Sequence, residues 1–133
     1  MDLVINGLTV HYVSIGEGFP ILMLHGYKVD HRVMTGCMEP VFQETPSFRR
    51  VYIDLPGMGQ TKRADWIKNA DAMLNLILEF IERVMPGERL LVAGESYGGY
   101  LARGLVRKLG SRVAGLLLIC PVIHPALEDR TLP

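Results

Sequence analysis

Two hydrophobic periodicities alternate along the chain. Near the N-terminus, residues 3–5 and 8–13 have the pattern of short strands on either side of Asn6 and Gly7. An Asn-Gly pair accepts the positive φ angles of a tight turn, so we predict an antiparallel hairpin there. The other predicted strands are short, mainly apolar runs: residues 21–24, 50–53, 89–94 and 113–119. Runs that are apolar at nearly every position are typical of parallel strands covered on both faces.

Segments with helical spacing separate these runs. Apolar residues recur every three or four positions over residues 73–85, and Asn69 is placed to cap the start of that helix. A second helix follows the run at 89–94 and stops at Gly110, whereas residues 33–43 have only a mixed helical pattern. Strands that alternate with helices predict an α/β fold: a mostly parallel sheet with an antiparallel N-terminal hairpin and helices on both faces.

The turn between the strand at 89–94 and the next helix reads Gly94-Glu95-Ser96-Tyr97-Gly98-Gly99. A serine at a sharp strand-to-helix turn has a strained backbone, and neighbouring glycines remove the Cβ atoms that would clash. Its hydroxyl would project from the sheet edge, close to the N–H groups of the new helix. Ser96 is therefore the candidate nucleophile, with Gly94, Gly98 and Gly99 supporting the turn. The alternative is a glycine-rich turn with a bystander serine; the glycines do not form a dinucleotide-binding pattern.

A second motif follows the strand at 21–24, which ends in His25-Gly26-Tyr27. A strand that ends in His-Gly before a polar loop is typical of a loop that supplies an oxyanion-hole donor. The backbone N–H of Tyr27 would be one donor and that of Tyr97 the other, because the charge on a carbonyl oxygen needs two. We interpret His25 as a structural residue that holds the loop, in preference to a general base.

Three further polar residues have weaker signals. Asp54 follows the strand at 50–53 and precedes a glycine-containing turn, so we expect its carboxylate to accept hydrogen bonds from loop N–H groups. A catalytic carboxylate is the less favoured reading of Asp54. His11 lies within an alternating strand and is interpreted as an ordinary strand side chain. His31 is expected in a loop, without an assigned role.

Composition excludes several classes of function. The chain has 133 residues, of which 49% are hydrophobic and 21% charged, with a formal net charge of zero, which suits one globular domain without affinity for nucleic acid or anionic lipid. No apolar run is long enough to span a membrane and no secretory signal is evident, so we expect a soluble cytoplasmic protein. Cys37 and Cys120 form no metal-ligand spacing with the four histidines, which predicts free buried thiols and no metal site.

Taken in order, the hairpin, the His25-Gly26-Tyr27 motif, the stretch 54–61 and the glycine-rich turn at 94–99 resemble the N-terminal part of an α/β-hydrolase-fold enzyme. The resemblance covers essentially the whole chain; Thr61 stands where serine is commoner. It implies a serine hydrolase that cleaves an ester, amide or related small-molecule acyl substrate without a cofactor. In that family the residue matching Ser96 is the nucleophile, and amides matching Tyr27 and Tyr97 form the oxyanion hole.

The resemblance also implies an acidic residue and then a histidine after the serine. Here His124 precedes Glu128 and Asp129, so we do not assign it as the base. The strand at 115–119 is apolar throughout and should pair on both edges. We therefore expect residues 1–133 to form one domain, incomplete at its C-terminus, with residues 120–133 starting a cap and with further chain or a partner chain completing the sheet. The alternatives are a non-catalytic binding module, an inactive fragment, or a carbon–carbon hydrolase or lyase.

Overall fold

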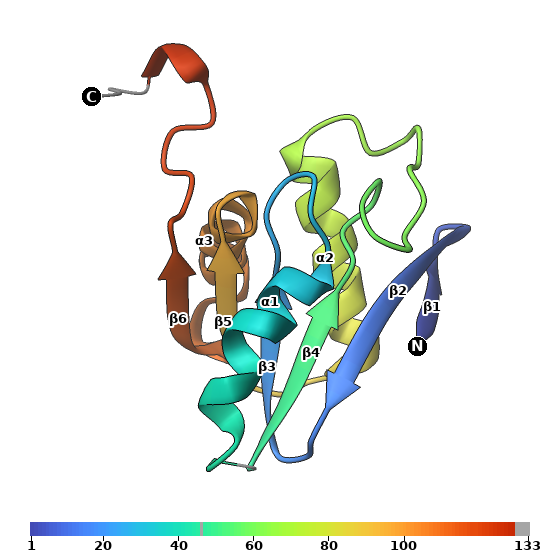
Figure 1. The fold of residues 1–133 in the computed structure, drawn as a ribbon. Helices are drawn as coiled ribbons and strands as arrows, with labels where there is room; N and C mark the ends of the chain where they lie inside the picture. Colours follow the sequence, from blue (N-terminus) through green and yellow to red (C-terminus); the bar gives the residue numbers. More distant parts are fainter. Residues whose placement is uncertain (46, 130–133) are drawn as a thin grey trace.

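The computed structural model describes residues 1–45 and 47–129, which form one six-stranded sheet flanked by helices (Figure 1). The strands are β1 (Asp2–Ile5), β2 (Leu8–Ile15), β3 (Phe19–Leu24), β4 (Phe48–Ile53), β5 (Leu90–Glu95) and β6 (Val113–Ile119). The helices are α1 (His31–Met38), α2 (Ala70–Val84) and α3 (Tyr97–Leu109). Short 3-10 turns occur at Glu39–Phe42, Gly110–Arg112 and Leu127–Asp129.

The strands lie in the order β1-β2-β4-β3-β5-β6. β1 and β2 form the predicted antiparallel hairpin, in which Ile5 pairs with Leu8 across Asn6 (φ 49°) and Gly7 (φ 78°). β2 is also antiparallel to β4, whereas β4, β3, β5 and β6 are mutually parallel. The predicted α/β class, the mostly parallel sheet and the N-terminal hairpin are confirmed.

The two faces of the sheet have separate cores. α2 and α3 cover one face and α1 covers the other (Figure 1). Because successive side chains of a strand point to opposite faces, β3 contributes Leu22 and Leu24 to the side of α2 and α3, and Ile21 and Met23 to the side of α1. A strand that packs on both faces has to be apolar at each of these positions, which is the pattern seen at 21–24.

The helix ends agree with the capping signals in the sequence. Asn69 Oδ1 accepts a hydrogen bond from Ala72 N (2.9 Å) at the start of α2, and α3 ends at Gly110, where φ is 54°. The mixed segment at 33–43 forms α1 and then a 3-10 turn with Pro40 near its start. The expectation that His31 lies in a loop is wrong, because His31 is the first residue of α1.

β6 is the edge strand of the described sheet and pairs with β5 alone. Its side chains Leu116 and Leu117 are 40% and 46% exposed, although the strand has the apolar sequence of an interior one. These leucines therefore lie at the margin of the described sheet, where less of the molecule covers them.

Two further expectations can be compared with the structure. The thiols of Cys37 and Cys120 are free, as predicted, but both residues are exposed, so their predicted burial is wrong. Cys37 lies on the outer side of α1 and Cys120 immediately follows the edge strand β6, so neither contributes to a core. None of the helices in the described part of the chain has the length and apolar character needed to cross a membrane. Of the proposed cap region 120–133, residues 130–133 lie outside the described residues.

Candidate active site

Ser96 lies alone between the last residue of β5 and the first residue of α3. Its φ of 50° and ψ of −113° belong to a region that L-residues rarely adopt, which costs on the order of 1–3 kcal/mol. Two hydrogen bonds hold this backbone in place: Ser96 N donates to Ile119 O at 3.0 Å, and Val122 N donates to Ser96 O at 3.0 Å. The end of β6 and the segment that follows it therefore brace the strained residue.

The glycines around Ser96 are required by close backbone contacts, and we call Gly94 to Gly99 the elbow. A Cβ on Gly94 would lie 2.6 Å from the carbonyl carbon of Gly98, and one on Gly98 would lie 2.6 Å from His25 O. A Cβ on Gly99 would lie 2.8 Å from the Cβ of Pro121. These contacts are closer than any real side chain tolerates, so the crowding inferred from the sequence is present in the fold.

The loop after β3 passes directly beside the elbow. A Cβ on Gly26 would lie 3.1 Å from Ser96 Cβ, so that only a glycine brings this backbone so near the serine. The rings of Tyr27 and Tyr97 meet edge to face, with centroids 6.5 Å apart. Within the described residues, the backbone N–H groups of Tyr27 and Tyr97 donate to no other protein group. Two unpaired donors therefore flank Ser96, as an oxyanion hole requires.

His25 ties this loop to the loop after β4. Its side chain is fully buried; Nε2 accepts a hydrogen bond from Leu55 N (3.0 Å) and Nδ1 donates to Gly26 O (2.7 Å). Burial lowers the pKa of His25 below its ordinary value, although the hydrogen bond to Gly26 and the charge of Asp54 act in the opposite direction. A neutral imidazole with both nitrogens in use fits the structural role predicted for His25.

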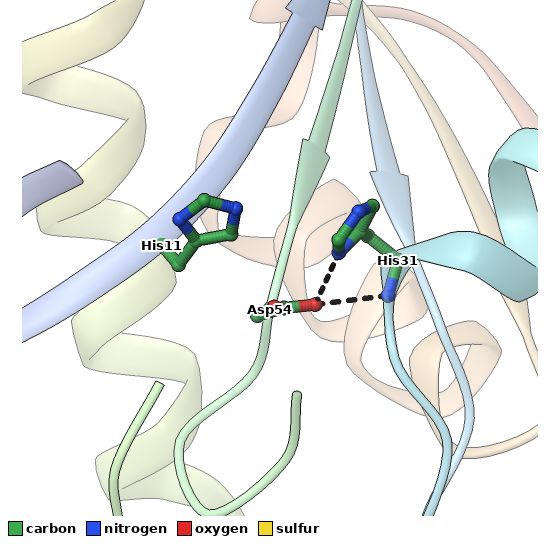
Figure 2. A group of neighbouring side chains, drawn as sticks. All are labelled: His11, His31 and Asp54. Carbon is green, nitrogen blue, oxygen red and sulfur yellow. Dashed lines mark hydrogen bonds and ion pairs between the residues drawn. The ribbon is translucent and has the colours of Figure 1, made fainter. Parts of the chain in front are cut away.

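His11, His31 and Asp54 form a polar group that we call the His–Asp cluster (Figure 2). Asp54 is fully buried and accepts three hydrogen bonds, from His31 N (2.9 Å), His31 Nδ1 (2.8 Å) and Gln60 N (2.9 Å). Burial by itself raises the pKa of Asp54, but these hydrogen bonds outweigh it and leave the pKa below its ordinary value. The predicted bonding of Asp54 to loop N–H groups is present, and Asp54 also holds the start of α1.

The sequence did not indicate that His11 and His31 meet. Asp54 N donates to His11 O at 2.9 Å, which extends the antiparallel pairing of β2 with β4. This pairing puts the side chains of His11 and Asp54 on the face of the sheet that α1 covers. The ring centroids of His11 and His31 are 5.7 Å apart. His11 Nδ1 is 2.9 Å from Asp2 Oδ1, and its Nε2 is 2.9 Å from the side-chain nitrogen of Gln60. Only the strand register, which has no local signal, brings these residues together.

A cluster of two histidines and one aspartate could also bind a metal ion. Its three ligand atoms all lie within 4.8 Å of one another. Asp54, His11 and His31 already have protein partners, so a metal would have to displace existing hydrogen bonds. The structure explains the cluster as a hydrogen-bonded network that joins β2, α1 and the loop after β4.

A cavity of about 470 Å³ opens beside the elbow. It is bounded by Tyr27 and Tyr97, by the turn after β4 and by the segment that leads into α2. Its lining residues are Tyr27, Pro56, Gly57, Met58, Arg63, Ala64, Ile67, Lys68, Asn69, Ala70, Met73 and Tyr97. Sequence reasoning missed residues 63–70 as part of this site, because nothing local shows that this segment returns to the end of β5. We call this hollow the elbow cavity.

Three histidines of the described residues are directed to groups other than Ser96. His11, His25 and His31 bond to other groups, as described above. His124 lies in the segment beyond β6, and Glu128 and Asp129 lie in the 3-10 turn Leu127–Asp129. The described residues thus place a strained serine beside two unpaired backbone N–H groups, without an acid and base assigned to it.

Comparisons with known proteins agree with this geometry. A family model described as "Alpha/beta hydrolase family" matches residues 21–133. The pimeloyl-(acyl-carrier protein) methyl ester esterase of Nitrosomonas europaea is 32% identical over 111 residues, 84% of this chain and 40% of that protein. The AB hydrolase superfamily protein YisY of Bacillus subtilis is 32% identical over 126 residues, 92% of this chain and 45% of that protein.

The solved structures give the same result. The crystal structure of an alpha/beta superfamily hydrolase from Oenococcus oeni superimposes with a TM-score of 0.86 at 35% identity. The match covers 92% of this chain and 45% of that one. The chain therefore spans a little under half the length of the relatives it matches.

Proposed function

Because the chain belongs to the alpha/beta hydrolase family, we propose that the protein is a serine hydrolase that cleaves an ester, amide or related acyl substrate through an acyl-enzyme on Ser96. The observation that carries the proposal is the strained conformation of Ser96 between two unpaired backbone N–H groups. A strained residue persists only where the surrounding structure holds it, and such residues concentrate at active sites. The esterase relative from Nitrosomonas europaea supports an ester as the substrate.

In the proposed reaction, Ser96 Oγ attacks the substrate carbonyl carbon while a histidine, other than the three directed to other groups, takes the hydroxyl proton. The amides of Tyr27 and Tyr97 donate to the carbonyl oxygen as it becomes negative. The bond to the alcohol or amine then breaks, and the leaving group departs with the proton held by the histidine. Water attacks the acyl-enzyme, the acid is released and Ser96 regains its proton. No cofactor takes part in this scheme.

The elbow cavity is the proposed site of the acyl group. It borders Tyr27 and Tyr97, and its volume of about 470 Å³ falls within the usual range of small-molecule sites. Met58, Ile67 and Met73 line it with apolar surface, which suits an acyl chain.

Replacing the nucleophile tests the reaction. Ser96→Ala should abolish hydrolysis of p-nitrophenyl esters and labelling by a fluorophosphonate probe, because both require an activated hydroxyl. Circular dichroism checks that the variant remains folded. Ser111→Ala, an exposed serine in the 3-10 turn after α3, is the matched control and should keep both activities. Undiminished turnover by Ser96→Ala would remove Ser96 from the mechanism.

A non-catalytic binding module is the second candidate, because His11, His25 and His31 all bond away from Ser96. Fluorophosphonate labelling separates the two candidates. A protein that folds, binds acyl ligands and is never labelled would be a binding module.

The exposed edge of β6 supports a further part of the proposal. Further strands, from a longer chain or from a partner chain, would pair with β6 and cover Leu116 and Leu117. The intact mass of the protein from its source cell separates these cases, since a mass well above 14.9 kDa places the strands in the same chain. The free thiols of Cys37 and Cys120 are consistent with a cytoplasmic location, which we also propose.

A further inference from the structure

The elbow cavity has a one-sided charge. Arg63 and Lys68 line it, and no aspartate or glutamate does. The formal net charge of the whole chain is zero, with 14 basic and 14 acidic residues, so a cavity with two cations and no anion departs from the average surface. Such a hollow concentrates positive potential where a substrate would bind.

In the described part of the chain, the cations of the cavity have no protein partner, whereas several other arginines of the fold do. Arg49, Arg50 and Arg83 each form an ion pair with a glutamate. Within the described residues, neither Arg63 nor Lys68 forms an ion pair or a side-chain hydrogen bond. The side chains of Arg63 and Lys68 are therefore available to an external anion.

The same cavity receives the N-terminal end of α2. Asn69 and Ala70 line it, and they are the cap and first residue of a helix that runs for 15 residues. The dipole of this helix adds to the positive potential of the two side chains, although each contribution is small at an exposed site.

We propose that the acyl substrate of this protein has a carboxylate at the end remote from the scissile bond, bound by Arg63 and Lys68. The inference rests on the proposed function, because it takes the elbow cavity as the acyl site. The apolar side chains of Met58, Ile67 and Met73 would contact the methylene chain between the ester and the carboxylate. An arginine binds a carboxylate through two parallel N–H groups, and the lysine adds a point charge. The substrate class is thus the half-ester of a dicarboxylic acid.

A matched pair of esters, assayed with the unmodified protein, tests the proposal. Mono-p-nitrophenyl adipate and p-nitrophenyl hexanoate have acyl chains of the same length and differ in the terminal carboxylate. We expect a higher kcat/KM for the adipate ester at low salt, and a preference that declines as salt screens the charges. The double variant Arg63→Gln/Lys68→Gln should reduce the ratio of the two kcat/KM values about tenfold, since two partly exposed charge interactions are lost.

Lys62→Gln is the control variant. Lys62 lines a second hollow near the N-terminal hairpin, which Arg63 also borders, but Lys62 does not line the elbow cavity, so its removal should leave the ratio unchanged. Equal kcat/KM values for the two esters would overturn the proposal, as would a preference that the double variant retains.

A binding measurement separates this proposal from the hydrolase proposal. Monomethyl adipate should bind the Ser96→Ala variant more tightly than methyl hexanoate, as measured by titration calorimetry, and the difference should disappear when Arg63 and Lys68 are also replaced. Binding without turnover in the unmodified protein would contradict the hydrolase proposal alone. Turnover of both esters without a difference in binding would contradict the carboxylate proposal alone.

Discussion

The elbow follows the carboxyl end of β5 and Asp54 of the His–Asp cluster follows the carboxyl end of β4, but the two regions are built in opposite ways. The elbow is a continuous stretch of chain in which the backbone is strained at Ser96 and N–H groups are left unpaired. The cluster joins residues from β2, α1 and the end of β4, and Asp54 accepts three hydrogen bonds within it. Strain with unpaired donors indicates a place for chemistry, whereas satisfied polar groups indicate a structural joint.

The largest expected effect is on the elbow backbone. Gly98→Ala should lower the free energy of unfolding by about 3 kcal/mol, because the new Cβ would overlap carbonyl oxygens at the end of β3 that cannot move independently of the sheet. Gly36→Ala is the matched control, since a Cβ there meets nothing within 4 Å, and it should stabilise α1 by up to about 1 kcal/mol. Urea denaturation of both variants measures the difference. A Gly98→Ala protein as stable as the unmodified one would refute the crowding account.

The stability of the protein should depend on the charge of Asp54 in the His–Asp cluster, and therefore on pH. Asp54→Asn should cost about 2 kcal/mol at neutral pH, because the amide N–H₂ cannot accept the hydrogen bonds that one of the carboxylate oxygens now accepts. The pKa of Asp54 is lower in the folded protein than in the unfolded chain. Its contribution to stability is therefore complete above the unfolded pKa of about 4 and is lost as the pH falls through the folded pKa.

Urea denaturation at a series of pH values measures this effect. The difference in stability between the unmodified protein and Asp54→Asn should shrink below about pH 4, where the unfolded carboxyl group begins to bind protons. Asp65→Asn, a change at an exposed aspartate, is the control and should have little effect at neutral pH. A difference for Asp54→Asn that does not change between neutral and strongly acidic pH would contradict the assigned role of the carboxylate.

The smallest expected effect is a gain in stability, whereas Gly98→Ala and Asp54→Asn reduce it. Ser96→Gly should raise the free energy of unfolding by about 1 kcal/mol, because glycine adopts a φ of 50° without strain, although it also gains entropy in the unfolded chain. Ser111→Gly, at a position with no positive φ, should instead be destabilising. Thermal denaturation of the two variants compares them. A loss of stability in Ser96→Gly as large as that in Ser111→Gly would show that the elbow stores no strain.

Much of the fold could be predicted because its signals are local. The Asn6-Gly7 turn, the cap at Asn69 and the stop at Gly110 each act within a few residues, and the structure has all three. The expectations that were wrong concern burial and element boundaries. Cys37 is exposed on the outer side of α1 and Cys120 is exposed just after the edge strand β6. Residue type alone does not reveal on which side of an element a cysteine lies.

The sequence by itself determined the elbow, because a strand, a serine, flanking glycines and a helix in direct succession leave the backbone few alternatives. It also determined the neighbouring Gly26 loop, whose glycine is needed where the chain passes Ser96. Only the tertiary structure decided which distant residues join them. The register of β2 against β4 puts His11 opposite Asp54, and the path of residues 63–70 brings Arg63 and Lys68 to the cavity beside Tyr97. Such contacts depend on how whole elements pack, and a pattern read over a few residues does not contain that information.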